Sequence, residues 1–580
     1  MTGKFISAAV AAILLTACTF TPKDGAHVLH VLSTNDIHGA YFDSTYVGGG
    51  VKASLLSVKA AVDSIRSEVG KENVLLIDAG DFLQGDNAAF YFNYVDTVTT
   101  HLYPRMAHAI GYDAVTVGNH DVETGHNVFD RIRKDLESYG IPFLGGNAVK
   151  PDGTRYFQLY ETYRRAGMKI LVLGYSNANI AAWLDKSIWS GMEFKSLLPL
   201  VQQDVDRIVA KEKPQVVIVS VHSGTGKGDG SELENQGLDL LNSLDGVDLV
   251  IAAHDHSPYF ELREDGRCAL VNSGARCKYM GEAVISVEVD GGKIKGRSVQ
   301  PVVFPLDRKK VDSGMKDSFH SDYVAVRDFT LRKVGALSED MYTRDSFLGM
   351  SNYIDLIHTV CLKATGADIS FAAPLSYDRK IAAGTIVYND LFTIYPYENQ
   401  LFTVRMTGKE VVSYLERSYD GWVCTVNGPH DHALKIQEKP DQRTGAKGWS
   451  FVERTYNFDS AAGISYSVDL TRPFGNRVTV TSMADGTAFD PEAMYVVCMT
   501  SYRASGGGGL MRDGAGIIDS AARTVGKYPE IRDLVYEFIS EHGTLDASLI
   551  NDQALLGTWS FVPENVAGTA LKRDFNLLFK

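Results

Sequence analysis

Five short groups of Asp, Asn and His residues are the part of this sequence whose types and spacing could do chemistry. In chain order they are Asn35-Asp36-Ile37-His38, Gly80-Asp81, Gly118-Asn119-His120-Asp121, His222 and His254-Asp255-His256. Carboxylate, amide and imidazole groups without thiolates suit divalent zinc, manganese or iron, and they are numerous enough here for two ions. A two-metal site clamps a phosphoryl group and lowers the pKa of a bridging water, giving a hydroxide that can attack phosphorus in line. The groups therefore indicate metal-dependent hydrolysis of a phosphoester.

Any one of these groups alone is weak evidence. Gly-Asp marks turns, and a single histidine at a strand end is usually a hydrogen-bonded surface or core residue. The chain contains its own control, because His430-Asp431-His432 repeats the tripeptide found at 254–256 but lies in a polar loop. We assign that copy no role. The evidence lies in the joint occurrence of five groups in order, each after an apolar run.

The elements that must position these groups are short buried strands. The apolar runs that precede them are Val28–Leu32, Val74–Ile77, Ala114–Val117, Val216–Val221 and Asp248–Ala253, with a further run at Lys169–Leu173. Segments with helical spacing lie between them, at Ala53–Val69, Val128–Tyr139 and Leu197–Lys211. This alternation predicts βαβ units. Ligands bind at the carboxyl ends of parallel strands, so the five groups can converge although they are far apart in sequence.

The alternation ends near residue 305 and defines a first domain over 28–305. A charged stretch at 306–334 predicts a solvated linker or a bridging helix, and a second mixed α/β region follows at 335–580. The chain has 580 residues, with 57 Lys+Arg against 71 Asp+Glu. This acidic balance argues against a binder of nucleic-acid polymers or anionic membranes, since both need a basic face.

The first residues predict a targeting segment. Lys4 precedes an apolar run over 5–15 that is too short to span a bilayer, and Leu15-Thr16-Ala17-Cys18 follows. Small residues before a cysteine resemble the bacterial lipoprotein signal. We expect a signal peptide at 1–17, lipidation of Cys18, a tether at 18–27 and a lipid-anchored protein of the bacterial cell envelope, facing the periplasm or the exterior. An ordinary secretory signal with a chance cysteine is the alternative.

The other five cysteines form no CxxC motif, so they indicate neither a disulfide framework nor a thiolate metal site. They are Cys268, Cys277, Cys361, Cys424 and Cys498. The sequence does not decide whether Cys268 and Cys277 form a disulfide.

In their order along the chain and in their residues, the five groups resemble the motifs of the calcineurin-like metallophosphoesterases, in particular the 5′-nucleotidase/UDP-sugar hydrolase/2′,3′-cyclic phosphodiesterase family. The resemblance covers roughly residues 28 to 515. The segments that carry it beyond the metal motifs are Gly80–Gly85, Gly366–Phe371, Gly384–Leu391, Pro396–Asn399 and Met406–Gly408. It implies a four-layer α/β/β/α N-terminal domain, a bridging linker helix, and a C-terminal α/β domain of the 5′-nucleotidase type that binds substrate.

The resemblance also implies roles for single residues. One ion would be held by Asp36, His38, Asp81 and His256, and a second by Asp81, Asn119, His222 and His254, with Asp81 as the bridge. His120 corresponds to the family's catalytic histidine, which stabilises charge on phosphate and can protonate the leaving oxygen. Its partner is Glu123, with the adjacent Asp121 as the alternative.

The resemblance implies a substrate pocket that this chain keeps in part. Phe458 and Tyr502 stand where two rings sandwich the base. Arg379 lies in a segment that retains cations but lacks the family's turn glycines. Gly508 replaces the acid that contacts ribose.

We therefore expect an enzyme that releases phosphate from nucleotides with two divalent ions. Cyclic nucleotides, UDP-sugars or other phosphomonoesters are alternative substrates for the same centre. A binding protein with a vestigial site is the alternative of another class, and the filled ligand positions argue against it.

Overall fold

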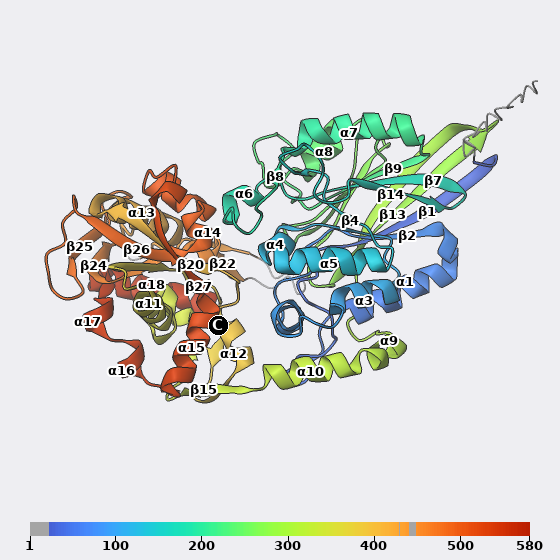
Figure 1. Ribbon diagram of the computed structural model, residues 1–580. Coiled ribbons are helices and arrows are strands. Elements are labelled where there is room, and N and C mark those ends of the chain that lie inside the picture. Colours follow the sequence, from blue (N-terminus) through green and yellow to red (C-terminus); the bar gives the residue numbers. More distant parts are fainter. Residues whose placement is uncertain (1–21, 429, 440–447, 580) are drawn as a thin grey trace, which may run out of the picture.

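The computed structural model describes residues 22–428, 430–439 and 448–579, and two sheets of six strands stack in its N-terminal half (Figure 1). The first sheet has the order β14-β13-β1-β2-β3-β4. Its strands are β14 (Lys293–Pro305), β13 (Tyr279–Asp290), β1 (Gly25–Thr34), β2 (Val74–Asp78), β3 (Ala114–Thr116) and β4 (Phe143–Leu144). The second has the order β11-β12-β10-β9-β7-β6. Its strands are β11 (Pro258–Leu262), β12 (Ala269–Ser273), β10 (Leu249–Ala252), β9 (Val216–Val221), β7 (Met168–Tyr175) and β6 (Tyr160–Arg165).

Helices cover the outer face of each sheet. The first sheet is covered by α1 (Leu55–Val69), α3 (Leu102–Ile110) and α5 (His126–Ser138), and the second by α7 (Leu197–Glu212) and α8 (Gly237–Ser243). Between the sheets lies a separate apolar core that includes Val31 from β1, Ile170 from β7 and Ile251 from β10. This is the expected four-layer α/β/β/α arrangement, and every predicted strand that precedes a ligand group is present.

The first sheet departs from the predicted βαβ pattern at one edge. Strand β1 begins earlier than expected because Gly25 pairs with Val289 in an antiparallel register with β13. Strands β13 and β14 form a long antiparallel hairpin, which completes that edge. Antiparallel strands can be joined by a short turn, so no segment with helical spacing lies between them. The alternation of strands and helices in the sequence therefore could not predict this hairpin.

Two helices follow β14 in the predicted linker region. They are α9 (Ser313–Ser318) and α10 (His320–Thr330), and α10 runs along the lower edge of the molecule from the first lobe toward the second (Figure 1). An ion pair of 2.5 Å between Arg105 and Asp322 ties α10 to α3. Strand β15 (Lys333–Leu337) then opens the second lobe.

The second lobe is built on a five-stranded sheet with the order β23-β17-β26-β20-β27. Its strands are β23 (Ser460–Ala462), β17 (Ile369–Ala372), β26 (Met494–Thr500), β20 (Gln400–Thr407) and β27 (Thr524–Glu530). Helices α11 (Asn352–Thr365) and α15 (Ile531–His542) contribute to one hydrophobic cluster, and α13 (Gly408–Trp422) contributes to another. The cluster of α11 and α15 also contains Phe90 of the first lobe, so the two lobes pack against each other.

The last residues of the chain complete this lobe. Strand β29 (Trp559–Val562) pairs in parallel with β24 (Ile464–Asp469), and α18 (Glu564–Leu578) follows it. His432 bonds Asp574 of α18 at 2.6 Å, so the control tripeptide contributes to the docking of this helix.

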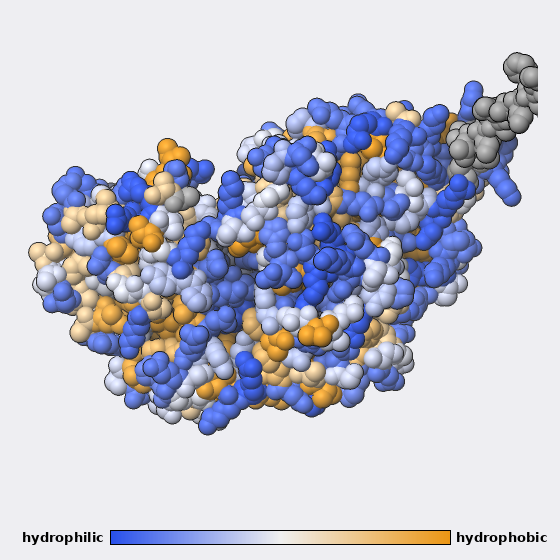
Figure 2. Space-filling model, in the orientation of Figure 1, coloured by the Kyte–Doolittle hydropathy of each residue, from blue (hydrophilic) through white to orange (hydrophobic). Residues whose placement is uncertain are grey.

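The visible surface is mostly hydrophilic, with apolar patches chiefly over the second lobe (Figure 2). Among the described residues no helix has both the length and the apolar character needed to cross a bilayer. Cys268 and Cys277 are buried free thiols. The predicted signal peptide and Cys18 lie outside the described residues.

Candidate metal centre

The carboxyl ends of five strands bring the predicted ligands together. Strands β1, β2 and β3 are parallel neighbours in one sheet, and β9 and β10 are parallel neighbours in the other. Each ligand group lies within a few residues of the end of its strand. The two sheets are stacked, so their carboxyl edges meet and groups more than two hundred residues apart in sequence become neighbours.

Asp36, His38 and His256 form the first group that could hold a metal ion, with ligand atoms within 4.8 Å of one another. Oδ1 of Asp36 lies 3.4 Å from Nε2 of His256 and 3.7 Å from Nε2 of His38. Asp36 and His38 are buried, whereas half of the His256 side chain is exposed. His256 therefore lies at the rim of the centre, and the other two residues lie beneath it.

Asp81, His222 and His254 form the second such group. Oδ2 of Asp81 lies 3.0 Å from Nε2 of His222, and Oδ1 of Asn119 lies 2.9 Å from Nδ1 of His254. The two groups adjoin, because Nε2 of His222 is 4.0 Å from Oδ1 of Asp36. All seven predicted ligands are thus assembled in one place.

Unpaired buried atoms show that this donor set fits divalent ions. Oδ1 of Asp36, Oδ2 of Asp81 and Nε2 of His222 are buried and make no hydrogen bond of normal geometry within the described part of the chain. A buried polar atom without a partner is costly, and ligand atoms that face one another across a short gap are the usual exception. Oxygen and nitrogen donors of this kind suit zinc, manganese or iron.

The backbone is held in an unusual conformation at most of the ligands. The residues with positive φ are Asp36 (49°), His38 (47°), Asp81 (63°), His254 (72°) and His256 (59°). Residues with side chains seldom adopt this region, and its cost is carried where the surrounding fold fixes it at a functional site. Strands β1, β2 and β10 end in such turns, which aim the following side chains across the carboxyl edge.

The electrostatics of the site favour ionised carboxylates. Burial would raise the pKa of Asp36, but the hydrogen bond and the charge of His256 outweigh it and hold the pKa at about 2. Burial acts against Asp81 in the same way, and the charges of His222 and His120 keep its pKa well below the usual range. Both carboxylates are therefore available to a cation at neutral pH.

The turn that presents Asp81 is fastened from below by Asp121. The Asp121 carboxylate accepts hydrogen bonds from the backbone N–H groups of Asp81 (2.9 Å), Phe82 (3.0 Å), Leu83 (3.1 Å) and Gly118 (2.8 Å). With both oxygens used in this way, Asp121 anchors the turn and does not face His120.

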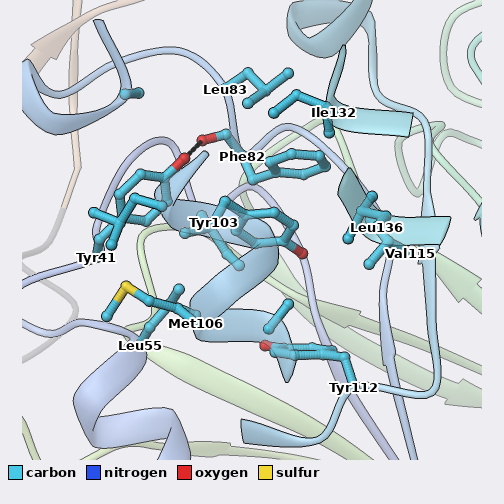
Figure 3. Packing of buried hydrophobic residues seen from close by; sticks show 14 of the residues in the cluster. Tyr41, Leu55, Phe82, Leu83, Tyr103, Met106, Tyr112, Val115, Ile132 and Leu136 are labelled. Carbon is cyan, nitrogen blue, oxygen red and sulfur yellow. Dashed lines mark hydrogen bonds between the residues drawn. The ribbon is translucent and has the colours of Figure 1, made fainter. Parts of the chain in front are cut away.

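Aromatic packing fastens the same turn to the core beneath it (Figure 3). The ring of Phe82 stacks on Tyr103 with centroids 3.7 Å apart, and the Tyr41 hydroxyl donates to the Phe82 carbonyl at 2.7 Å. The three residues are fully buried. The position of Asp81 is thus set by the core under α3.

His120 lies beside the metal ligands and pairs with Glu123. Nδ1 of His120 is 2.5 Å from Oε2 of Glu123, and the His120 ring centroid is 5.5 Å from that of His38. Burial would lower the pKa of His120, but the carboxylates of Asp81 and Glu123 outweigh it and raise the pKa to about 10. A protonated imidazole next to the ligands can stabilise charge on a phosphoryl group and donate a proton.

The three residues predicted to bind substrate, Phe458, Tyr502 and Arg379, differ from one another in their burial and contacts. Phe458 is fully buried, and its ring stacks on Trp422 with centroids 5.5 Å apart. This differs from the expected clamp, because a ring that packs in the core has no face open to a base. Tyr502 is partly buried beneath the Arg503 guanidinium, and Arg379 is exposed, with its backbone bonded to Thr343.

The second lobe also contains a ring near the centre that residue spacing did not identify. Burial raises the pKa of Tyr456 and of Tyr502, and the Glu234 carboxylate of the first lobe adds to both shifts. Helix α14 (Ser501–Ala504), which carries Tyr502, packs against α6 (Ile180–Trp183) of the first lobe, and Trp183 stacks on His254 of the centre. Tyr456 stands two positions before Phe458, and only the fold distinguishes which of these rings is exposed.

The stacked sheets, the ligands at their carboxyl edge and the adjacent histidine define a metallophosphoesterase domain. Comparison with protein families agrees, since residues 29–258 match the calcineurin-like phosphoesterases and residues 333–513 match the 5′-nucleotidase C-terminal domain. The two matches span most of the chain. The chain belongs to the family of metal-dependent phosphoesterases that combine these two domains.

Individual relatives agree with this assignment. Protein UshA of Salmonella pullorum is 25% identical over 94% of this chain and 98% of its own length. The trifunctional nucleotide phosphoesterase YfkN of Bacillus subtilis is 22% identical over 95% of this chain, which spans only 40% of that longer protein. A solved structure from Staphylococcus aureus, assigned as a 5′-nucleotidase, has a TM-score of 0.74 at 19% identity and covers 92% of this chain and 99% of its own. The last of these likenesses concerns the fold alone.

Proposed function

We propose that this chain is a 5′-nucleotidase, which hydrolyses nucleotides to nucleosides and phosphate with two divalent ions. The observation that carries the proposal is the assembly of two adjoining ligand groups beside a protonated histidine. Two ions bound there would supply Lewis acidity toward phosphoryl oxygens and a lowered pKa for water. The second lobe supports a nucleotide substrate, because residues 333–513 match the 5′-nucleotidase C-terminal domain.

The chain's own residues have three tasks in this reaction. The strand-end turns hold the ligand atoms in place before substrate binds, so the geometry costs nothing during the reaction. His120 donates from Nε2 toward the phosphoryl group or the leaving oxygen, since Nδ1 is taken by Glu123. Glu123 fixes the ring orientation and stabilises the imidazolium.

Phosphate release from a substrate panel tests the proposal. The protein is freed of metal with a chelator, reloaded with zinc, manganese or iron, and assayed with 5′-nucleotides, 2′,3′-cyclic nucleotides, UDP-sugars and p-nitrophenyl phosphate. We expect the highest kcat/KM for a 5′-nucleotide and no activity before reloading. Comparable kcat/KM for p-nitrophenyl phosphate would contradict the nucleotide proposal while leaving the phosphoesterase centre intact.

A second candidate substrate class follows from Gly508. A Cβ atom built there would lie 2.3 Å from Nη1 of Arg503 and 2.5 Å from Oδ1 of Asn457, at a φ of 70°. The position therefore has no room for the acid that contacts ribose in the resembling family. This observation favours a phosphoester without a free ribose diol, such as a 2′,3′-cyclic nucleotide, and the same panel distinguishes it from a 5′-nucleotide.

We propose in addition that the protein is anchored in the cell envelope through a lipid on Cys18. The support is the apolar run and the Leu15-Thr16-Ala17-Cys18 sequence. Strand β1 starts at Gly25 and leads to Asp36, so the chain enters the fold about 30 Å from the ligands, given about 3.3 Å per strand residue. We expect palmitate labelling that Cys18→Ala abolishes. An unlabelled protein in the soluble fraction would refute the anchor.

A further inference from the structure

Three histidines of the candidate centre each have one ring nitrogen held by an acceptor outside the ligand cluster. The pairs are His222 Nδ1 with the Ala79 carbonyl (2.7 Å), His38 Nδ1 with the Gln84 carbonyl (3.1 Å) and His254 Nε2 with Oε1 of Glu234 (2.9 Å). Carbonyl and carboxylate oxygens only accept, so the held nitrogen carries the hydrogen. The other nitrogen then offers its lone pair to the cluster. His254 differs from the other two, because its partner is a charged side chain.

We propose that Glu234 is a positioning residue for His254, and that it presents Nδ1 of that ring to the second metal site. Nδ1 lies 2.9 Å from Oδ1 of Asn119, while Nε2 on the opposite side of the ring faces Glu234. A carboxylate behind a ligand histidine fixes its tautomer and raises its basicity. The inference deepens the proposed function and rests on its two-metal site.

The backbone of Glu234 is held tightly enough for this task. Its carbonyl accepts from the Ser223 hydroxyl at 2.7 Å and from Nδ2 of Asn177 at 3.0 Å, and both of these residues are fully buried. The Ser223 hydroxyl also accepts from the backbone N–H of Gln236 at 2.9 Å. The loop after β9 is therefore fastened at its base directly beside His222, and the Glu234 side chain extends from a fixed point.

The His254 ring is restrained on a further side. Trp183 of α6 (Ile180–Trp183) stacks on it with ring centroids 5.2 Å apart and an angle of 16° between the planes. The His254 backbone N–H donates to Oδ2 of Asp36 at 2.8 Å. Stacking on the flat indole limits rotation of the ring about its Cβ–Cγ bond, and the bond to Glu234 determines which ring nitrogen carries the hydrogen.

The Glu234 side chain can also be replaced without disturbing the core. It is 44% exposed at the rim of the centre, so replacing it leaves no cavity in the core. Nothing in the sequence distinguishes Glu234 from the other acids of its loop. Only the contact with His254 identifies it.

Metal binding by purified variants tests this role without reference to turnover. Apoprotein is titrated with zinc or manganese alone against a chelating indicator, and bound metal is counted by mass spectrometry. We expect two ions on the wild type. Glu234→Ala should keep one ion and weaken the other by about 10- to 100-fold, as loss of an outer-shell partner does. Glu234→Gln should recover most of that loss, because its amide oxygen still accepts from Nε2–H.

Glu232→Ala is the matched control, because Glu232 belongs to the same loop and pairs with Lys227 at 2.7 Å. It should bind both ions like the wild type. Wild-type affinity for both ions in Glu234→Ala would overturn the inference, as would an equal loss in Glu232→Ala. A wild type that binds fewer than two ions would instead overturn the two-metal site, and the inference with it.

Discussion

Nδ1 of His120 lies 2.5 Å from Oε2 of Glu123, one turn further along the same short helix, α4 (Asn119–Glu123). Asp121 stands between them in sequence, but its two oxygens face the backbone of the Asp81 turn. Two neighbouring acids thus do different work. Glu123 controls the charge of the histidine, and Asp121 controls the shape of the turn that carries the ligand Asp81.

Replacing His120 should reduce turnover and leave the metals in place. We expect His120→Ala to lower kcat by roughly 10²- to 10⁴-fold, the usual share of one acid–base or charge-stabilising group. Glu123→Gln should lower kcat less and move the alkaline limit of activity to lower pH, because it removes a charge that raises the pKa of His120. Phosphate release across pH measures both effects. Loss of bound metal in His120→Ala would make that residue a ligand instead.

Replacing Asp121 should mainly reduce the stability of the fold. An asparagine side chain at this position could accept only two of the four backbone hydrogen bonds, and its NH₂ group would face the other two donors. We expect Asp121→Asn to lower the free energy of unfolding by about 3 kcal/mol, since hydrogen bonds to a charged group contribute about 1.5–3 kcal/mol each. Urea denaturation at pH 8 measures this, above the pKa of about 6 to which burial and Asp81 raise Asp121. Glu137→Gln, at an exposed position of α5, is the control and should unfold like the wild type.

Much of the first lobe and its ligand set could be predicted because the relevant signals are local. Each strand is a short apolar run, and each ligand follows such a run directly, so the carboxyl-edge rule was enough to bring Asp36 and His254 together. What could not be predicted depends on contacts between distant segments. The antiparallel β13–β14 hairpin is one case, and the bond between Glu234 and His254 is another.

The aromatic pair shows the same limit at a single residue. The family resemblance implied Phe458 as one ring of the clamp, but a position in the sequence does not determine which of two nearby rings faces outward. Phe458 turns into the core beside Trp422, while Tyr456 remains partly exposed. The orientation is decided by packing under α13, which no local pattern encodes.

Alanine at the two predicted clamp positions should therefore give different results. Phe458→Ala removes a fully buried ring and should cost about 3–5 kcal/mol of stability, with nucleotide and p-nitrophenyl phosphate hydrolysis falling together on heating. Tyr502→Ala should unfold like the wild type and raise KM for a nucleotide by roughly 5- to 150-fold, given about 1–3 kcal/mol per stacked base. Its KM for p-nitrophenyl phosphate should not change. An unchanged nucleotide KM in folded Tyr502→Ala would show that this ring contacts no base.

The contact between the lobes should make stability depend on pH through Glu530. Arg532 is fully buried, lies with its guanidinium 4.9 Å from the centre of the Phe90 ring, and bonds Glu398 at 2.8 Å. Glu530 lies 3.8 Å from the same guanidinium, and its Oε2 has no hydrogen-bond partner among the residues that the structure describes. Burial, and then the charge of Glu398, raise the pKa of Glu530 to about 8 from a usual value of 4.5.

The sign of the effect follows from which state binds the proton. Between pH 4.5 and about 8 the folded protein keeps a proton on Glu530 that the unfolded chain has lost, so stability falls as pH rises through this window. We expect Glu530→Gln, which is neutral at every pH, to remove about 2–3 kcal/mol of the decrease in the free energy of unfolding between pH 5.5 and pH 9, a figure lowered for the partial exposure of the side chain. Urea denaturation of both proteins in the same metal-loaded form measures the difference. Glu537→Gln, at an exposed position of α15, is the matched control and should retain the wild-type pH dependence. Equal pH dependence in Glu530→Gln and the wild type would show that Glu530 is ionised in the folded protein throughout this range.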